Sequence, residues 1–235
     1  MTEETYHILD VIISAAVAIG TLALAILAVY QDRIRAWIEA PKLKVLLDNQ
    51  PPDCLAIPFT DSQTGAFISD TIHVRFRVKN EGKTAARLVE VYAERLDEYR
   101  NGQWVQRTSF PSMNLNWADV GGIYFSSISP DMAKHCDLGH VVDPARRATA
   151  ELRHEQNPAL NLNDQTTSFT FSTIVRPNHI GHIVEPGRYR LTVRLAAANA
   201  KPTTQVIEIE FLGQWFPDEA RMLRDGIRAA VSTSA

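Results

Sequence analysis

A run of apolar residues near the N-terminus constrains this chain more than any other feature. From Val11 to Val29 no side chain is charged, and the only polar side chains are Ser14 and Thr21. As a helix rising about 1.5 Å per residue, the stretch Asp10–Tyr30 would be roughly 30 Å long, the thickness of the hydrocarbon core of a bilayer. The sequence therefore predicts a single transmembrane helix and makes the lipid bilayer the first expected partner.

The charges that flank this run predict its orientation. No Lys or Arg precedes it, whereas Arg33, Arg35, Lys42 and Lys44 follow it. Because the basic flank of a membrane helix stays in the cytoplasm, we expect the N-terminus outside and the remainder in the cytoplasm, with the protein in the inner (cytoplasmic) membrane. A cleaved signal peptide is the alternative, but it needs a positively charged start and a shorter apolar run.

A stripe of small side chains runs along one face of this helix. Its members recur at steps of four and three residues: Ser14, Ala18, Thr21, Ala25 and Ala28. Such stripes let two helix backbones approach closely in lipid. The pattern predicts a homo-oligomer formed through the helix, although these residue types are common in membrane helices of every kind. We expect the helix to continue into a short amphipathic extension and to stop at Pro41.

The remainder is long enough for one domain with a substantial core. We divide the chain into an outer N-terminus at 1–9, the membrane helix with its extension at 10–40, a β domain at 41–216, and a C-terminal helix and tail at 217–235.

All 24 Lys and Arg residues follow position 30, as do 24 of the 27 acids, because Glu3, Glu4 and Asp10 precede it. A near-neutral domain lacks the electrostatic footprint of a protein that binds a nucleic acid polymer.

Alternation of apolar and polar residues predicts antiparallel strands in this domain. The clearest are Thr71–Asn80 and Tyr189–Leu195, and Asn101-Gly102 is a strong signal for a two-residue hairpin turn. Asp48–Pro58 contains three prolines and is predicted to be an irregular loop, whereas Pro217–Val231 is predicted to be a helix. The fold class is mainly β: about eight or nine short strands in an antiparallel sandwich or barrel.

The hairpin after the first of these strands resembles a known type of module. Its sequence is Val78-Lys-Asn80-Glu-Gly82-Lys-Thr-Ala85, followed by Val89-Glu-Val91. This order is similar to that of immunoglobulin-like β-sandwich modules in bacterial surface and adhesion-related proteins, and one span followed by a cytosolic sandwich is similar to the layout of many bacterial membrane proteins. The resemblance implies an immunoglobulin-like sandwich and no functional residue, because such folds host unrelated functions.

Metal-compatible side chains form two small groups, Cys136 with His140 and His179 with His182. One Cys and three His could bind zinc tetrahedrally, but Cys-x3-His is not a usual zinc spacing, and a buried strand would equally place this Cys in the core. A nucleophilic arrangement of Cys136, His140 and Asp143 is a further alternative. Because the sequence contains no nucleotide-binding, hydrolase or zinc-peptidase motif, we predict neither an enzyme nor a cofactor.

Basic side chains line one side of the two clearest strands: Arg75, Arg77 and Lys79 on the first, Arg190 and Arg194 on the second. If these strands were neighbours, five cations would share one face and could bind a small anionic ligand or lipid headgroups. The alternative is a solvated face on which cross-strand acids balance these cations: Glu90, Glu94, Glu208 and Glu210. The near-neutral domain favours this alternative.

Three functions remain at this point. The first is a membrane-anchored cytosolic sandwich that binds or scaffolds an unknown protein. The second is an oligomeric membrane effector whose β domain senses a small anionic, nucleotide-like ligand. The third is a metal-dependent hydrolase at the Cys136/His cluster. The sequence favours the first because it contains no positive evidence for catalysis.

Overall fold

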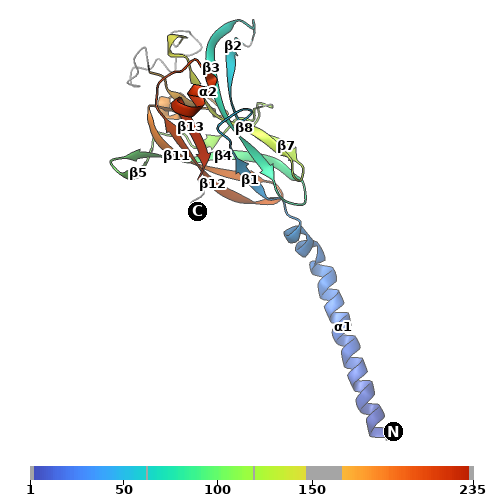
Figure 1. Ribbon diagram of the computed structural model, residues 1–235. Helices are drawn as coiled ribbons and strands as arrows, with labels where there is room; N and C mark the ends of the chain where they lie inside the picture. The colour runs from blue at the N-terminus through green and yellow to red at the C-terminus, as the bar shows by residue number, and fades with distance from the viewer. Residues whose placement is uncertain (1–2, 62, 119, 147–165, 233–235) are drawn as a thin grey trace. The chain divides into compact units, whose positions relative to one another are not determined.

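The computed structural model describes residues 3–61, 63–118, 120–146 and 166–232. The chain divides into two compact units, Met1–Ala40 and Pro41–Ala235. The first is a single helix and the second contains every strand that the structure describes. This division confirms the expected fold class: mainly β, with one N-terminal apolar helix (Figure 1).

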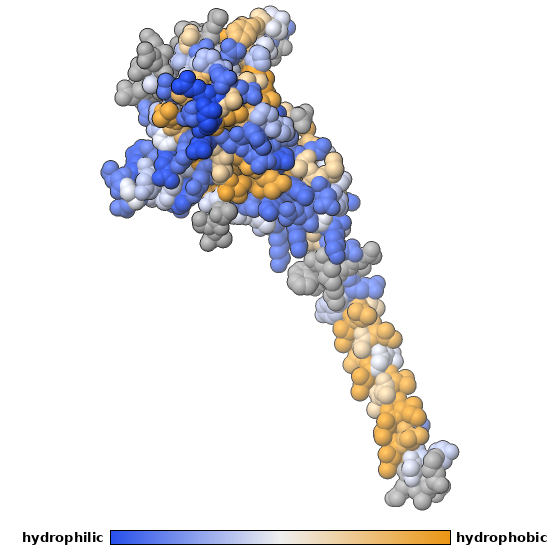
Figure 2. Space-filling model, viewed as in Figure 1, coloured by the Kyte–Doolittle hydropathy of each residue, from blue (hydrophilic) through white to orange (hydrophobic). Residues whose placement is uncertain are grey.

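The first unit is the helix α1 (Glu3–Ile38). Within Thr5–Gln31, an 18-residue window has a mean hydropathy of 2.6, and none of that window is buried against the rest of the chain. Figure 2 shows its surface as a nearly continuous hydrophobic column. The helix begins nearer the N-terminus than predicted and ends before Pro41. Length and composition make it a helix that could cross a membrane.

The strands of the second unit form two antiparallel sheets. The first sheet contains β1 (Leu43–Leu46), β2 (Cys54–Thr60), β3 (Phe67–Asn80), β8 (Ala133–Val142), β9 (Phe169–Phe171) and β10 (Ile183–Val184). The second contains β4 (Ala86–Arg100), β5 (Gln103–Gln106), β6 (Met113–Asn114), β7 (Tyr124–Ile128), β11 (Gly187–Ala197), β12 (Ala200–Phe211) and β13 (Ile227–Val231). Helical turns join them: η1 (Pro144–Arg146), η3 (Ile180–His182), α2 (Glu219–Arg221) and η4 (Met222–Gly226).

One hydrophobic core lies between the two sheets. The predicted alternation is confirmed in β3, where Val74, Phe76 and Val78 are fully buried, and in β11, where Leu191 and Val193 are. Trp117 and Tyr189 are the largest fully buried side chains among the residues that the structure describes. Burial of each large apolar side chain stabilises the fold by about 1.5–3 kcal/mol, so this core holds the sandwich together.

The turn between β4 and β5 is the one that Asn101-Gly102 predicts. Both residues have positive φ, 50° at Asn101 and 83° at Gly102, which is the left-handed region that such turns require. β4 itself is one long strand, and it contains an irregularity at Leu88, where φ is 49°.

Two segments differ from the sequence prediction. Cys54–Thr60 forms β2 rather than a loop, because Pro58 lies at a sheet edge, where the missing N–H breaks no ladder bond. At the same edge the Ala56 N–H donates to Glu219 Oε2 at 2.6 Å. The expected C-terminal helix is present over residues 219–226, but Ile227–Val231 then forms β13 against β12. In β13, buried and exposed side chains alternate with a period of two, which is the pattern of a strand and not of a helix.

A buried asparagine organises the end of the sandwich at which β1 begins, here called the Asn80 end. Asn80 Oδ1 accepts from the N–H groups of Lys42 and Gly82 at 3.1 and 3.0 Å. Its Nδ2 donates to the carbonyls of Thr84 and Ile128 at 2.8 and 3.0 Å. All four hydrogen-bonding positions of the amide are thereby used. The Asn-x-Gly turn on which the resemblance rests therefore has a structural role here.

Candidate functional site

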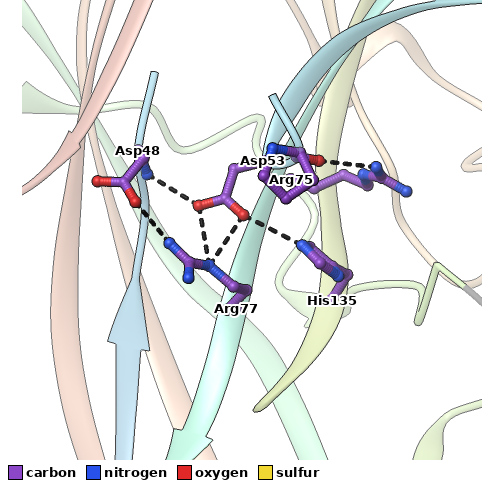
Figure 3. A network of polar contacts seen from close by, with 6 residues as sticks. Asp48, Asp53, Arg75, Arg77 and His135 are labelled. Carbon is purple, nitrogen blue, oxygen red and sulfur yellow. Dashed lines mark hydrogen bonds and ion pairs between the residues drawn. The ribbon is translucent and has the colours of Figure 1, made fainter. Parts of the chain in front are cut away.

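The most elaborate polar cluster on the first sheet centres on Asp53. We call it the Asp53 network: Asp48, Asp53, Arg75, Arg77 and His135. Figure 3 shows the Asp53 carboxylate between the guanidinium of Arg77 and the ring of His135. The loop from β1 to β2 supplies both acids, β3 supplies both arginines, and β8 supplies the histidine.

The carboxylate of Asp53 is fully buried and all of its contacts are accounted for. Arg77 Nε lies 2.9 Å from Asp53 Oδ1, and His135 Nε2 lies 3.1 Å from the same oxygen. Asp53 Oδ2 accepts the backbone N–H of Asp48 at 2.9 Å. A buried charge needs such partners to be tolerated. Both oxygens of the Asp53 carboxylate are therefore occupied, and neither is left to activate a substrate.

The outer parts of the network attach the β1–β2 loop to β3. Arg77 also pairs with Asp48 at 2.6 Å, and that carboxylate is largely exposed. The Arg75 N–H donates to the Asp53 carbonyl at 2.9 Å, and its guanidinium donates to the Pro52 carbonyl at 2.8 Å. These contacts tie a proline-containing loop to the sheet at several points. We interpret the network as a structural clamp.

Two histidines face each other on the same outer face. His73 on β3 pairs in register with His140 on β8, and their ring centroids lie 5.7 Å apart. Burial lowers the pKa of His73 to about 4, and the charges of His140 and Arg75 act in the same direction. His73 is therefore neutral near pH 7.

The predicted basic face is divided between two sheets. β3 belongs to the first sheet and β11 to the second, so their cations do not share a face. Lys79 lies 3.8 Å from Asp131, and on β11 Arg190 and Arg194 lie 2.7 and 2.5 Å from Glu208 and Glu94. Glu208 and Glu94, which neutralise these two β11 arginines, are among the acids that the sequence suggested. Arg75 and Arg77 instead have their partners in the Asp53 network. Ligand binding at these five positions stays a prediction.

The predicted metal ligands do not form one group. Among the residues that the structure describes, no cluster of three or more His, Cys, Asp or Glu side chains could hold a metal. Cys136 points into the core, where its thiol contacts the Asn116 carbonyl at 3.3 Å, whereas His140 lies opposite His73. His179 and His182 instead fold the η3 turn, in which His179 Nδ1 accepts the Gly181 N–H at 3.0 Å.

Neither cysteine has the properties of a nucleophile. Both Cys54 and Cys136 are buried free thiols. Burial raises the pKa of Cys54 to about 12 and raises the pKa of Cys136 well above its ordinary value. Because the thiolate is the reactive form, the arrangement of Cys136 with His140 and Asp143 lacks an activated nucleophile.

A groove that the sequence did not indicate lies between two loops, at the end of β4 away from Asn80. It consists of two adjoining cavities of about 250 and 530 Å³, which share Arg107, Thr108 and Ser109 in their walls. The smaller continues along Glu98 and Arg100, and the larger along Phe110, Pro111 and η3. We call it the Arg107 groove. It combines polar donors with an apolar wall, and its larger cavity has the volume of a small-molecule site.

Local packing fixes the shape of this groove. Arg107 is largely buried and donates to the Ile183 carbonyl at 3.2 Å. A Cβ on Gly181 would collide with the Ser109 carbonyl, so only glycine lets η3 approach this closely. The two walls are far apart in the sequence and show no periodic pattern. The glycine at 181, between His179 and His182, is a local sequence sign of close packing at η3. It does not show which segment packs against η3.

A second cavity on the second sheet is lined by several arginines. Its volume is about 400 Å³, and its walls include Arg188, Arg224 and Arg228 together with Glu210 and Asp225. Arg188 Nε lies 3.0 Å from Glu210, and Arg224 Nε lies 3.1 Å from Asp225. Arg228 has no ion pair or hydrogen bond from its side chain within the described part of the chain. The site has a small excess of positive charge.

The small-residue stripe of α1 is exposed along the isolated helix. The hydroxyl of Thr21 donates to the Val17 carbonyl at 2.8 Å within the same helix, so it already has a partner. The remaining members, Ser14, Ala18, Ala25 and Ala28, lie on the face that their spacing implies. Self-association through this face stays a prediction.

Comparison with known proteins adds no assignment. Neither the known protein families nor the curated proteins include a match to this chain.

Proposed function

We propose that this protein is a single-pass membrane protein whose β-sandwich binds a partner or small ligand at the Arg107 groove and holds it at the cytoplasmic face of the membrane. The single observation that carries the binding role is the groove itself: two adjoining cavities with hydrogen-bonding and apolar walls, formed by loops on a rigid sandwich. Loops held by a scaffold are where binding sites commonly occur.

The anchoring role is supported by the exposure of α1. None of the apolar stretch Thr5–Gln31 is buried by the chain itself. An exposed apolar surface of this length is not tolerated in water, and lipid is the environment that its length fits. The basic residues that follow, Arg33 and Arg35, favour a cytoplasmic sandwich.

The chemistry of the described residues favours binding over turnover. The buried Asp53 carboxylate is occupied by contacts within the protein, and both thiols are buried. We therefore propose a module without catalysis, in which the contents of the groove are retained and not converted.

A second candidate function rests on the cavity lined by Arg188, Arg224 and Arg228. Its excess guanidinium favours a small anionic ligand such as a phosphate ester, as an effector would require. Titrating the full-length protein in nanodiscs with adenosine monophosphate tests this candidate. A rise in melting temperature that Arg228→Glu abolishes supports it, and an unchanged melting temperature contradicts it.

Photo-crosslinking tests the proposed groove. A photoreactive amino acid replaces Ser109 in the groove, or exposed Ser127 on β7 as the matched control, in the full-length protein in its native membrane. We expect a discrete crosslinked product at position 109 and none at 127. Gly181→Ala, which forces the two groove walls apart, should remove the product while circular dichroism still shows a folded sandwich. Equal products at both positions, or none at 109, would contradict the proposal.

A further inference from the structure

The lysines of this chain are gathered at one end of the sandwich. The sequence contains six of them: Lys42, Lys44, Lys79, Lys83, Lys134 and Lys201. All lie at or next to the Asn80 end, because they belong to the start of β1, the end of β3, the turn after it, the start of β8 and the start of β12. Away from this end, the basic residues on the strands β4, β11 and β13 of the second sheet are all arginines.

Hydrogen bonds show that the elements carrying these lysines meet. The Lys42 N–H donates to Asn80 Oδ1, and the Glu81 N–H donates to the Lys42 carbonyl at 2.7 Å. The β11–β12 turn joins the same end through Asn199, whose Oδ1 accepts the Arg87 N–H at 3.0 Å. Asn199 Nδ2 also donates to the Ala85 carbonyl at 2.9 Å, so the turns next to Lys83 and Lys201 are adjacent.

The charges at this end are not balanced. Two carboxylates at this end, those of Glu81 and Asp131, lie 3.7 and 3.8 Å from Lys44 and Lys79. Four further exposed cations have no ion pair among the residues that the structure describes: Lys42, Lys83, Arg87 and Lys201. On β11, by contrast, each arginine is paired with a glutamate. Self-repulsion of this kind is unfavourable unless an anionic partner is nearby.

Apolar side chains accompany these cations. Met132, in the turn before β8, is 52% exposed, and Leu88, next to Arg87, is 48% exposed. Lysines that surround an exposed apolar side chain are suited to a bilayer surface, where the ammonium groups meet phosphates and the apolar group enters the interface. Lysine is also a hydrated point charge, which suits a fluid headgroup layer better than a fixed bidentate site.

If α1 is anchored in a membrane, the linker between α1 and β1 is short enough to keep this surface close to that membrane. Only four residues, 39–42, separate the end of α1 at Ile38 from the start of β1 at Leu43. A fully extended chain of this length reaches at most about 18 Å. Tethering at such short range gives a weak surface a high effective concentration of lipid.

We propose that the Asn80 end docks on anionic lipid headgroups of the membrane that α1 enters. This inference rests on the proposed anchoring. Docking would fix the orientation of the sandwich and direct its opposite loops, including the Arg107 groove, away from the bilayer. The surface needs no bound ligand and recognises negative surface charge, so it depends on lipid composition.

An environment-sensitive fluorophore tests the docking. It is attached to Met132→Cys or, as a control, to Gln103→Cys on exposed β5, in the full-length protein; Cys54 and Cys136 are buried and do not compete for the label. The protein is placed in nanodiscs of phosphatidylcholine alone or of phosphatidylcholine with phosphatidylglycerol. We expect a blue shift at position 132 only with phosphatidylglycerol, and no shift at position 103. The shift should be lost at about 0.5 M salt, where the Debye length is short.

Charge reversal makes the test specific. Lys83→Glu with Lys201→Glu should abolish the blue shift, whereas Arg228→Glu, elsewhere on the sandwich, should leave it unchanged. Docking is contradicted if position 132 gives the same emission in both lipids, or if the double variant retains the shift. Co-elution of the protein with nanodiscs is measured first. Failure to incorporate would instead refute the anchoring, so the two failures are distinguishable.

Discussion

The two outer faces of the sandwich carry similar rows of basic side chains but neutralise them differently. On the first sheet, Arg77 reaches a fully buried carboxylate, Asp53, that a loop inserts beside it. On the second sheet, Arg190 and Arg194 pair with Glu208 and Glu94 on the neighbouring strands, and all four side chains are partly exposed. The first arrangement clamps a loop, whereas the second keeps a flat sheet face soluble.

This difference shows that two similar patterns of charged residues can contribute very differently to the stability of the fold. Exposed cross-strand pairs contribute little, because water and salt compete with them. Removing one partner from a buried network is far more damaging, because the other charge stays buried without compensation. The comparison therefore predicts a steep gradient of mutational effects from the Asp53 network to the β11 face.

The largest effect is expected at Asp53. Asp53→Ala removes the partner of Arg77 and His135 inside the clamp and should lower the free energy of unfolding by about 3–5 kcal/mol. Asp48→Ala, which removes only the exposed partner of Arg77, should cost about 1 kcal/mol or less. Urea denaturation of both variants measures the contrast. Equal losses would show that the buried carboxylate is not the centre of the clamp.

An intermediate effect is expected from His73 as the pH falls. Its pKa of about 4 in the folded state is below its ordinary value of 6.5. The unfolded chain therefore takes up the proton first, so stability is fully present above pH 6.5 and is lost as the pH falls towards 4. At pH 5 this loss is up to about 2 kcal/mol.

The variant His73→Gln should remove this part of the pH dependence. Its unfolding free energy should fall less than that of the wild type between pH 6.5 and 5, as measured by denaturation at each pH. His182→Gln is the comparison, because it alters another buried histidine without touching the His73–His140 pair. Parallel pH profiles for the wild type and His73→Gln would contradict the prediction.

The smallest effect is expected on β11. Glu94→Gln, which removes the carboxylate facing Arg194, should change the free energy of unfolding by less than about 1 kcal/mol. Most of that change should vanish at high salt, because both side chains are partly exposed to solvent. Melting temperatures at low and high salt measure it. A loss as large as that of Asp53→Ala would remove the distinction between the two faces.

Local patterns explain how much of the fold the sequence predicts. Alternation in β3 and β11 and the Asn101-Gly102 turn depend on residues close in the chain, and all three predictions are confirmed. The strand β2 was missed because Pro58 is tolerated at an edge that the sequence does not reveal. β13 was missed because the sequence does not show that β12 offers a free edge to pair with.

The candidate site depends on contacts that no local pattern encodes. In the Asp53 network, Arg77 is 24 residues and His135 is 82 residues from the carboxylate. Alternation placed Arg77 on the basic side of its strand, but could not tell that β3 and β11 belong to different sheets. The Arg107 groove likewise depends on the packing of η3 against a distant loop.

The most direct test of the account is the fate of α1 in the cell. The full-length protein with a C-terminal tag is expressed, and its membranes are extracted with alkaline carbonate and treated with protease in sealed vesicles of each orientation. We predict an uncleaved chain that stays in the membrane pellet, with the sandwich digested only where the cytoplasmic face is exposed. A soluble chain that has lost its N-terminal helix would identify α1 as a signal sequence and would contradict the central claim.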